Sequence, residues 1–398
     1  MNITQVFAEE GCMIQKAQDI LDCALAKHPD VVNAELEKDR DKKLVDIAKQ
    51  RPNPELDSSL LFGNTADDTN PNTQTSLMMV LELGGKRKAR IEQASQNGKK
   101  SAVNTQENKE IVALQTVLAL YRLREINAEL VRVNETIATF DKTLNTFKSR
   151  PKLTPEQEVS FSSFDLAREE YKLKKISLIQ EQSNLSYSLV LSTGKSFEAL
   201  KKFLPSFKTQ WPSLSNNSSS ENAQLAKAKA DLGLSSANIR VAQSKAWPDL
   251  KVGPTFTTES LTNSNTTIVT GGVGFSLPLP ILNRNQGEKA FAYADKQRAE
   301  TNLALVLKKT AVERENQQQR YKSAVQALKQ TGQTSSLNLQ HENIESYFEK
   351  GLVPSTLVIE THRQLYEITK TRNEQELAAI DALWRIYIID GKVFEAKL

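Results

Sequence analysis

Three histidines are the side chains of this sequence best suited to metal chemistry, because imidazole nitrogens bind zinc and related ions. They are His28, His341 and His362. His341 and His362 are equally far from the centre of a turn predicted at residues 351–354, so they should face one another across a helical hairpin, with Glu342 and Glu345 nearby. Two imidazoles without a fixed third ligand do not define a metal site. We interpret them as ordinary helix-surface histidines and predict no metal ligands.

No constellation of residues in the sequence predicts catalysis. The GxSxG, HExxH and Walker patterns are absent. Residues 270–274, TGGVG, superficially resemble a nucleotide-binding loop, but their glycines alternate along a predicted strand. Pro278 and Pro280 follow where a phosphate-binding helix should begin. We therefore predict no catalytic residue and no cofactor.

The two cysteines, Cys12 and Cys23, lie 11 residues apart and lack CxxC spacing. In an oxidising compartment they would pair, and in a reducing one they would act as small hydrophobic residues. Glu9 and Glu10 make the stretch before Cys12 too charged for a lipid-attachment signal. Residues 1–15 contain neither the basic nor the apolar region of a signal peptide, so if the protein is exported, we expect this sequence to be the mature form.

The charge balance argues against a nucleic-acid partner. The chain has 52 basic and 48 acidic residues, a net charge of +4, whereas polynucleotide-binding proteins carry a stronger or more clustered basic excess. No run of 18 apolar residues is available for a transmembrane helix. The short alternating strands of a β-barrel remain compatible with this composition.

The pattern of apolar residues, glycines and prolines predicts one order of elements that occurs twice. The first half contains a helix at 17–50 with a start or kink at Pro29, strands at 56–64 and 73–83 around a turn at 66–72, a helix at 89–147, a tip at 148–155 and a helix at 156–191. The second half contains a helix at 223–246, strands at 250–258 and 266–277 around a turn at 263–265, a helix at 288–350, a tip at 351–354 and a helix to 391. At about 1.5 Å per residue, the helix at 288–350 would span roughly 90 Å.

This order predicts a duplicated chain. The first structural repeat covers residues 1–204, a connector rich in Ser and Asn covers 205–222, and the second repeat covers 223–398. Helices this long cannot surround one compact core and must pack as bundles or coiled coils. Four strands are too few to close a barrel, and open sheet edges cannot face lipid, so several copies must supply strands. Three copies would give 12 strands.

Two strand-to-helix junctions carry a family resemblance. Residues 272–288, GVGFSLPLPILNRNQGE, resemble the second junction of the TolC-like outer-membrane efflux proteins. Residues 81–91, LELGGKRKARI, resemble the first junction in the heavy-metal-cation (CzcC-like) branch. Gly and Pro permit a sharp change from strand to helix. The junction residues are Gly84, Gly85, Lys86, Arg87, Pro278, Pro280, Asn285 and Gly287.

The resemblance implies a mostly α fold with a small β part. Long helical hairpins would form a trimeric α-barrel, and four strands per chain would contribute to a 12-stranded β-barrel in the outer membrane of a Gram-negative bacterium. The homotrimer would extend into the periplasm and work with a periplasmic adaptor protein and an inner-membrane pump of the resistance-nodulation-division class. The channel would conduct passively, without catalysis, and the branch favours heavy-metal cations. Lys86, Arg87, Lys88 and Arg90 would either meet lipid head groups or form a solvated helix start.

The resemblance also places functional residues at the hairpin tips. The turn that docks the adaptor would be Gly351, Leu352, Val353, Pro354 and Ser355, and the first tip adds the basic stretch Arg150, Pro151 and Lys152, suited to acids on a neighbouring hairpin. Glu360 falls where an acidic aperture residue is common in the family, and a symmetric ring of carboxylates attracts cations. The alternative for Glu360 is an exposed helix carboxylate. Leu357 stands where a further acid often occurs, which argues against a double acidic ring.

A periplasmic coiled-coil adaptor or structural hairpin protein is the alternative function. An adaptor would need lipoyl-like and barrel segments flanking one hairpin. The sequence instead predicts two hairpins, each preceded by a pair of strands.

Overall fold

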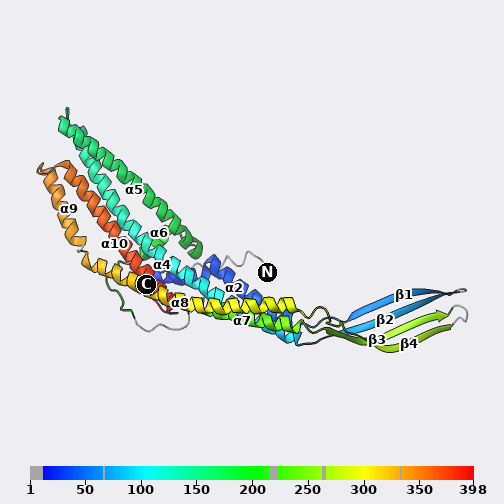
Figure 1. Cartoon of the computed structure of the whole chain (residues 1–398). Coiled ribbons are helices and arrows are strands. Elements are labelled where there is room, and N and C mark those ends of the chain that lie inside the picture. The colour runs from blue at the N-terminus through cyan, green and yellow to red at the C-terminus, as the bar shows by residue number, and fades with distance from the viewer. Residues whose placement is uncertain (1–11, 66–67, 215–221, 262–265, 332–333) are drawn as a thin grey trace. The chain divides into compact units, whose positions relative to one another are not determined.

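The protein is mostly helical, with one four-stranded antiparallel sheet (Figure 1). The structure, a computed structural model, describes residues 12–65, 68–214, 222–261, 266–331 and 334–398. The predicted fold class of long helices and four strands per chain is confirmed. Within the described part of the chain, no helix combines the length and apolar character needed to cross a membrane.

The chain divides into two compact units. The first contains the described residues of 1–33, 106–223 and 308–398, and the second contains those of 34–105 and 224–307. Each unit therefore takes segments from both of the predicted structural repeats. The first unit holds the tips of both long hairpins, and the second holds the sheet and the strand-to-helix junctions.

The sheet of the second unit has the strand order β1-β2-β3-β4. Its strands are β1 (Glu55–Thr65), β2 (Asp68–Glu82), β3 (Asp249–Leu261) and β4 (Thr266–Ser276). The antiparallel register places large apolar side chains on one face of all four strands, because successive residues of a strand point to opposite faces. That face carries Leu56, Leu60, Phe62, Leu77, Met79, Leu81, Phe256, Val269, Val273 and Phe275, all exposed. The period-two interpretation of these segments is confirmed, and the sheet presents one apolar face to its surroundings.

The predicted turn at residues 66–72 was wrong for its second half. β2 already begins at Asp68 and includes Pro71, which pairs with Phe62 of β1. The pairing of β2 with β3 starts only at Asn72, so Pro71 has a strand neighbour on one side. Proline lacks a backbone N–H and is tolerated at such an edge position. Residues 66–67 and all of the predicted second turn, 263–265, lie outside the described residues.

The predicted first helix is divided into three. It comprises α1 (Ala17–Lys27), α2 (Pro29–Lys42) and α3 (Leu44–Lys49), so the start predicted at Pro29 is confirmed. In the second unit, α7 (Ala223–Ser244) precedes β3 as predicted.

Two helical hairpins build most of the first unit. α4 (Lys86–Lys148) and α5 (Pro155–Thr193) form the first, followed by the short α6 (Phe197–Leu200) and a 3₁₀ turn at Lys201–Phe203. The predicted continuous helix at 288–350 was wrong. It is divided into α8 (Gln286–Gln330) and α9 (Thr334–Glu349), with α10 (Ser355–Ile389) completing the second hairpin. α8 ends before Thr331, which is not helical, and residues 332–333 lie outside the described residues.

Helix α1 is tied to the first unit by a disulfide and an apolar cluster. Cys12 and Cys23 form a disulfide bond, which corresponds to the oxidising alternative. Ile20 packs with Leu120 of α4 and Leu189 of α5, and all three are almost fully buried. The start of the described chain is therefore anchored to the first hairpin.

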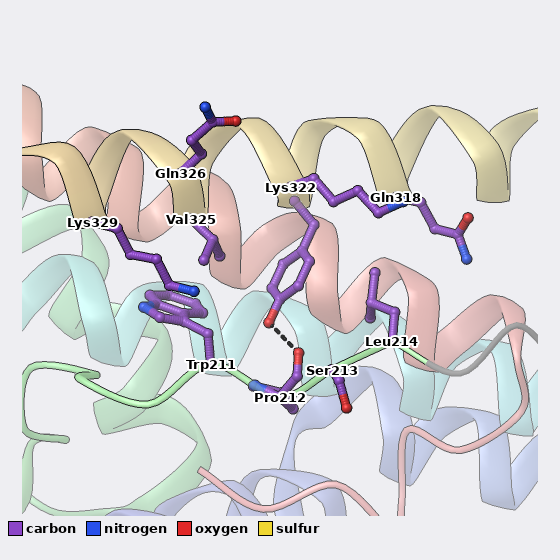
Figure 2. A pocket seen from close by; sticks show the side chains of 10 residues that line it. Trp211, Pro212, Ser213, Leu214, Gln318, Lys322, Val325, Gln326 and Lys329 are labelled. Carbon is purple, nitrogen blue, oxygen red and sulfur yellow. Dashed lines mark hydrogen bonds between the residues drawn. The ribbon is translucent and has the colours of Figure 1, made fainter.

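The connector contributes apolar anchors to the first unit. Trp211 and Leu214 pack against a buried cluster of α8 and α10 that includes Tyr321 and Leu383. The Tyr321 hydroxyl donates a hydrogen bond of 2.7 Å to the carbonyl oxygen of Pro212. Figure 2 shows this contact beside a cavity of about 530 Å³ between the connector and α8. Residues 205–214 of the predicted connector are thus packed on the helices.

One buried carboxyl group of α4 makes the stability pH-dependent. The Glu110 side chain is 3% exposed, and burial raises its pKa from 4.5 to about 7, although a hydrogen bond from Gln106 opposes the shift. Between about pH 4.5 and 7 the folded state holds a proton that the unfolded state has released, so this group's contribution to stability falls as pH rises. At pH 8 we expect Glu110→Gln to raise the free energy of unfolding by up to about 3 kcal/mol.

Below pH 4.5 the Glu110→Gln variant should match the wild type, because the carboxyl group is then neutral in both states. Denaturant unfolding at pH 8 and pH 4.3, followed by circular dichroism, measures the difference. Glu315→Gln, at an exposed position of α8, is the control and should show no such pH dependence. Equal effects of Glu110→Gln at both pH values would contradict the prediction.

Candidate functional site

The first strand-to-helix junction is formed by two glycines in the left-handed region, Gly84 (φ +68°) and Gly85 (φ +73°). α4 starts directly after them at Lys86. A Cβ atom on Gly84 would lie 2.5 Å from the Cβ and ring atoms of Trp247, whereas one on Gly85 would have no neighbour within 4 Å. Gly84 is therefore required both by the backbone conformation and by the close approach of Trp247.

The basic residues that follow these glycines bind partners within the second unit. Lys86 Nζ lies 2.7 Å from Asp249 Oδ1 at the start of β3. Arg87 Nε donates to the Lys49 carbonyl oxygen at 2.8 Å, and Arg90 pairs with the Glu82 carboxylate. These cations thus connect the start of α4 to both strand pairs and to α3. Contact of this cluster with lipid head groups remains a prediction.

The second junction is held by Asn285, a non-glycine residue with positive φ (57°). Asparagine tolerates this conformation better than most residues. Its side-chain amide donates to the Ala242 carbonyl oxygen at 2.9 Å and to Glu288 Oε2 at 2.7 Å. Glu288 also pairs with Lys245 at 2.7 Å, so α8 begins against the end of α7. A Cβ atom added to Gly287 would have no neighbour within 4 Å, while Pro278 and Pro280 lie in the segment without regular secondary structure between β4 and α8.

The tip of the second hairpin is a Schellman turn. The Gly351 N–H donates to the Phe348 carbonyl oxygen at 2.8 Å and the Leu352 N–H to that of Tyr347 at 2.9 Å, while Gly351 has φ +73°. This motif ends a helix with glycine in the left-handed region. Pro354 then takes the N-cap position of α10, which starts at Ser355. The turn leaves Leu352 exposed, with Val353 partly covered.

The tip of the first hairpin lies beside the second, at one end of the first unit (Figure 1). Ser355 Oγ lies 3.1 Å from Ser160 Oγ of α5, and Lys142 Nζ of α4 lies 2.7 Å from Glu349 Oε1 of α9. Thr154 caps α5 by accepting a hydrogen bond from the Gln157 N–H. Pro151 and Lys152 lie in the exposed turn before it. Near the tips, Lys142 is thus a basic residue that pairs with an acid of the neighbouring hairpin.

Arg150 makes a different contact from the ion pair suggested by its charge. Its guanidinium lies over the Phe147 ring, 5.5 Å from the centroid, which is a cation–π arrangement. Arg150 also lines a cavity of about 530 Å³ between the two tips, together with Thr139, Glu345, Phe348 and Gly351. Residues of both predicted tips thus share one cavity.

Glu360 lies on α10 and its charge is locally compensated. Arg363 donates two hydrogen bonds to its carboxylate, at 2.9 and 2.8 Å, and Gln364 donates a third at 2.8 Å. The hydrogen bonds from Arg363 lower the pKa of Glu360, so the carboxylate stays ionised at neutral pH. In a symmetric ring of Glu360 carboxylates, each carboxylate would be paired with the guanidinium group of Arg363. The aperture role of Glu360 remains a prediction.

Comparison with known proteins identifies the chain. Residues 214–392 match the sequence model of the family described as "Outer membrane efflux protein". This part of the chain belongs to that family. The chain is 24% identical over 299 residues to the cobalt-zinc-cadmium resistance protein CzcC of Cupriavidus metallidurans, a match covering 71% of this chain and 68% of that protein.

Solved structures show the same fold over nearly the whole efflux protein. CusC matches with a TM-score of 0.67 and 15% identity, covering 96% of this chain and 95% of that one. The CmeC outer membrane channel of Campylobacter jejuni matches with a TM-score of 0.71 and 13% identity, covering 97% and 89%.

Proteins of this family share a general function. The efflux protein is an outer-membrane channel component of tripartite systems, reaches into the periplasm and is not an enzyme. TolC-like channels of this kind are homotrimers that work with an adaptor and an inner-membrane pump. The TolC-like family resemblance is thereby confirmed.

His341 and His362 of the efflux protein face one another across the second hairpin, with ring centroids 4.4 Å apart. The prediction that they are helix-surface residues was wrong for His362, which is 3% exposed and lies against the Phe140 ring. Glu345 lies beside both imidazoles, 3.1 Å from His362 Nε2. Burial and the neighbouring His362 lower the pKa of His341, and hydrogen bonding to His362 lowers that of Glu345. The sequence signal that places Glu345 beside His341 is their spacing of four residues, one helical turn.

The efflux protein also buries a set of charged residues of α4, α5 and α10 that were not predicted from the sequence. Arg122 binds Glu129 at 2.8 Å and Glu181 at 2.7 Å, and Arg124 binds Glu376 of α10. These pairs connect α4 to α5 and to α10. The acids Glu125, Glu129 and Glu376 have no exposed side-chain area. The spacing of Arg122, Glu125 and Glu129 along one helix face was the available signal, but it is equally typical of a solvated helix.

Proposed function

We propose that this outer-membrane efflux protein, as a homotrimer, passes heavy-metal cations to the exterior from a resistance-nodulation-division pump and a periplasmic adaptor. The observation that carries the choice of substrate is the match to a cobalt-zinc-cadmium resistance protein. The first junction supports it, since Gly84-Gly85-Lys86-Arg87 is the sequence feature that resembles that branch.

The sheet supports the membrane part of the proposal. One face of all four strands is apolar and exposed, as lipid contact requires, while the opposite face carries residues such as Gln74, Thr257 and Thr270. The strands contain 11 to 15 residues, long enough to cross the hydrocarbon layer when tilted.

The tips support the proposed contact with the adaptor. Leu352 is 68% exposed at the end of a turn fixed by the Schellman hydrogen bonds, so an apolar side chain is presented on a defined backbone. Such exposed apolar residues mark protein interaction sites when they are grouped, and the partly covered Val353 lies next to Leu352. We therefore assign the docking turn to residues 351–355.

Deleting the gene from its host should lower tolerance to cobalt, zinc or cadmium while leaving tolerance to lipophilic drugs unchanged. The reason is that, without the channel, the substrate moved by the pump would stay in the periplasm. The minimum inhibitory concentration of each compound measures this, and a plasmid copy of the gene should restore it. A loss of drug tolerance alone would overturn the metal substrate but not the channel function.

The same complementation assay tests the docking turn. Leu352→Asp should fail to restore metal tolerance although the variant reaches the outer membrane in normal amount, because a carboxylate cannot be buried against an apolar partner. Leu352→Ile, which keeps the apolar surface, is the matched control and should restore tolerance. Full restoration by Leu352→Asp would remove the docking assignment.

A further inference from the structure

We propose that His341, Glu345 and His362 bind one divalent transition-metal ion of the zinc class, which joins α9 to α10 beside the hairpin tip. Within the described residues, these three side chains form the group of potential metal ligands whose donor atoms all lie within 4.8 Å of one another. His341 and Glu345 are one turn apart on α9, and His362 comes from α10. The site goes beyond channel function and does not depend on which substrate is exported.

The distances between the donor atoms fit a tetrahedral ion. His341 Nε2 and His362 Nε2 are 3.3 Å apart, His362 Nε2 and Glu345 Oε1 are 3.1 Å apart, and His341 Nε2 and Glu345 Oε1 are 3.6 Å apart. Zinc bonds of about 2.0–2.1 Å in tetrahedral geometry separate neighbouring ligand atoms by about 3.3 Å. The three distances match this spacing, although His341 Nε2 is also 3.3 Å from His362 Nδ1. The His341 ring must therefore turn toward His362 Nε2 to share an ion with it, and the fourth corner of the tetrahedron is left for water.

Thr136 sets the protonation of His362 in favour of metal binding. The Thr136 hydroxyl donates its proton to the Arg132 carbonyl oxygen at 2.9 Å, and Thr136 Oγ1 lies 3.1 Å from His362 Nδ1. Because the hydroxyl proton is used, Thr136 accepts from His362, and Nδ1 carries the imidazole proton. The lone pair of the neutral ring is then on Nε2, the atom that faces Glu345. A partner on the second ring nitrogen is the usual companion of a metal-binding histidine.

In this arrangement two hydrogen-bond acceptors, His362 Nε2 and the Glu345 carboxylate, face one another. The lone pair of His362 Nε2 faces the Glu345 carboxylate, and His341 Nε2 lies within 3.6 Å of both. Thr139 adds a hydrogen bond of 3.2 Å to Glu345 Oε1, which orients the carboxylate. A positive charge must lie among these atoms, either a proton on an imidazole or a metal ion. Other charges near His341 come from Arg132 and Glu135 of α4, which are of opposite sign.

Glu345 also gives the site an entry path. It lines the cavity of about 530 Å³ between the two tips, whose other lining residues include Thr139, Thr143 and Phe348. An ion arriving through this cavity would meet the carboxylate first and then the two imidazoles. The same cavity has room for the water that completes the tetrahedron.

Zinc binding by the purified, detergent-solubilised full-length protein tests the proposal. After removal of metals with a chelator, titration with zinc chloride in a calorimeter should show saturable uptake of one ion per chain. Cobalt(II) should bind the same site and give the intense visible absorption of a tetrahedral ion. His341→Gln should abolish the one-per-chain uptake, and Thr136→Val, which removes the partner of Nδ1, should weaken binding by about 10- to 100-fold.

His28→Gln is the matched control, since His28, between α1 and α2, lies beside Asp30 of α2 and should not affect zinc uptake. Each variant is first checked for the oligomeric mass of the wild type, so a misfolded variant is recognised. Glu345→Gln, at a partly exposed ligand, provides a second test should a buried substitution disturb folding. Absence of zinc uptake by the wild type, or uptake unchanged in both His341→Gln and Glu345→Gln, would show that a proton occupies the site and would overturn the proposal.

Discussion

Replacement of Arg124 by methionine is expected to lower the free energy of unfolding by about 3–5 kcal/mol. Arg124 binds the Glu376 carboxylate, which has no exposed side-chain area. In the variant, Glu376 would keep a single hydrogen bond, 2.9 Å from the Lys208 N–H, for a buried negative charge. Removing one member of a buried ion pair is strongly destabilising because the other charge remains out of water.

The neighbouring Glu125 adds little to this expected loss. Burial raises its pKa to about 8, although Arg124 and Arg122 oppose the shift, so its carboxyl group is mostly neutral at pH 7. Part of the cost comes from packing instead, since the Arg124 guanidinium lies 5.4 Å from the centroid of the Phe207 ring. Methionine retains an apolar stem of similar length and limits this part.

Arg363→Met is the matched control for Arg124→Met. Arg363 also pairs with a glutamate of α10, Glu360, but both side chains are about half exposed. Exposed pairs contribute roughly 0–1 kcal/mol, so this variant should unfold almost as the wild type does. Denaturant titration followed by circular dichroism measures both. Equal losses in the two variants would mean that burial of the Arg124–Glu376 pair has no energetic consequence.

The double replacement Arg124→Met and Glu376→Met distinguishes two causes of a large stability loss in Arg124→Met: the unpaired buried charge and the lost packing of Arg124. Replacing both members of a buried ion pair by apolar residues is often neutral or stabilising. The double variant should therefore recover most of the stability lost in Arg124→Met. A double variant as unstable as the single one would attribute the loss to packing of Arg124 rather than to the unpaired charge.

The repeat of strands and hairpins was predictable because local chemistry determines it. The alternation around Leu77, Met79 and Leu81 requires a strand wherever one face is apolar, and the glycines at 84 and 85 allow the chain to turn from strand into helix. Gly351 followed by Pro354 predicts the hairpin tip in the same way. In each case the deciding residues are adjacent in sequence.

The remaining features depend on residues far apart in the sequence. His362 is buried because Thr136 and Phe140 of α4 cover it, and nothing near His362 in the sequence indicates this contact. Arg124 and Arg363 have similar helical surroundings, yet only Arg124 lies between α4 and α10. The break between α8 and α9 was missed because an apolar period without proline was interpreted as a continuous helix.

Gly84→Ala should be the most damaging single substitution at the strand-to-helix junctions, with an expected loss of about 3 kcal/mol or more in the free energy of unfolding. Two costs add at this position. The left-handed backbone, with φ +68°, costs an alanine roughly 1–2 kcal/mol. The new methyl group would also lie 2.5 Å from the Trp247 Cβ and ring atoms, and overpacking of this kind costs about 1–3 kcal/mol.

Trp247 cannot relieve the clash by a small side-chain motion. The atoms nearest the added methyl are its Cβ, Cγ and Cδ1, which are at the root of the side chain rather than at its flexible end. Two residues later, Asp249 pairs with Lys86 at 2.7 Å and with Glu82 in the register of β2 and β3, so the backbone that carries Trp247 is also restrained. Either the start of α4 or the loop before β3 must therefore shift.

Gly85→Ala isolates the backbone part of this cost. Gly85 has nearly the same φ, +73°, but an added methyl group there meets nothing within 4 Å, so only the loss of about 1–2 kcal/mol is expected. Denaturant titration of both variants, and of each combined with Trp247→Ala, gives a double-mutant cycle. Trp247→Ala should recover about 1–3 kcal/mol in the Gly84→Ala background and nothing in the Gly85→Ala background. If the two glycine variants lose equal stability, the close approach of Trp247 does not restrict the junction, and the left-handed backbone alone explains the requirement for glycine.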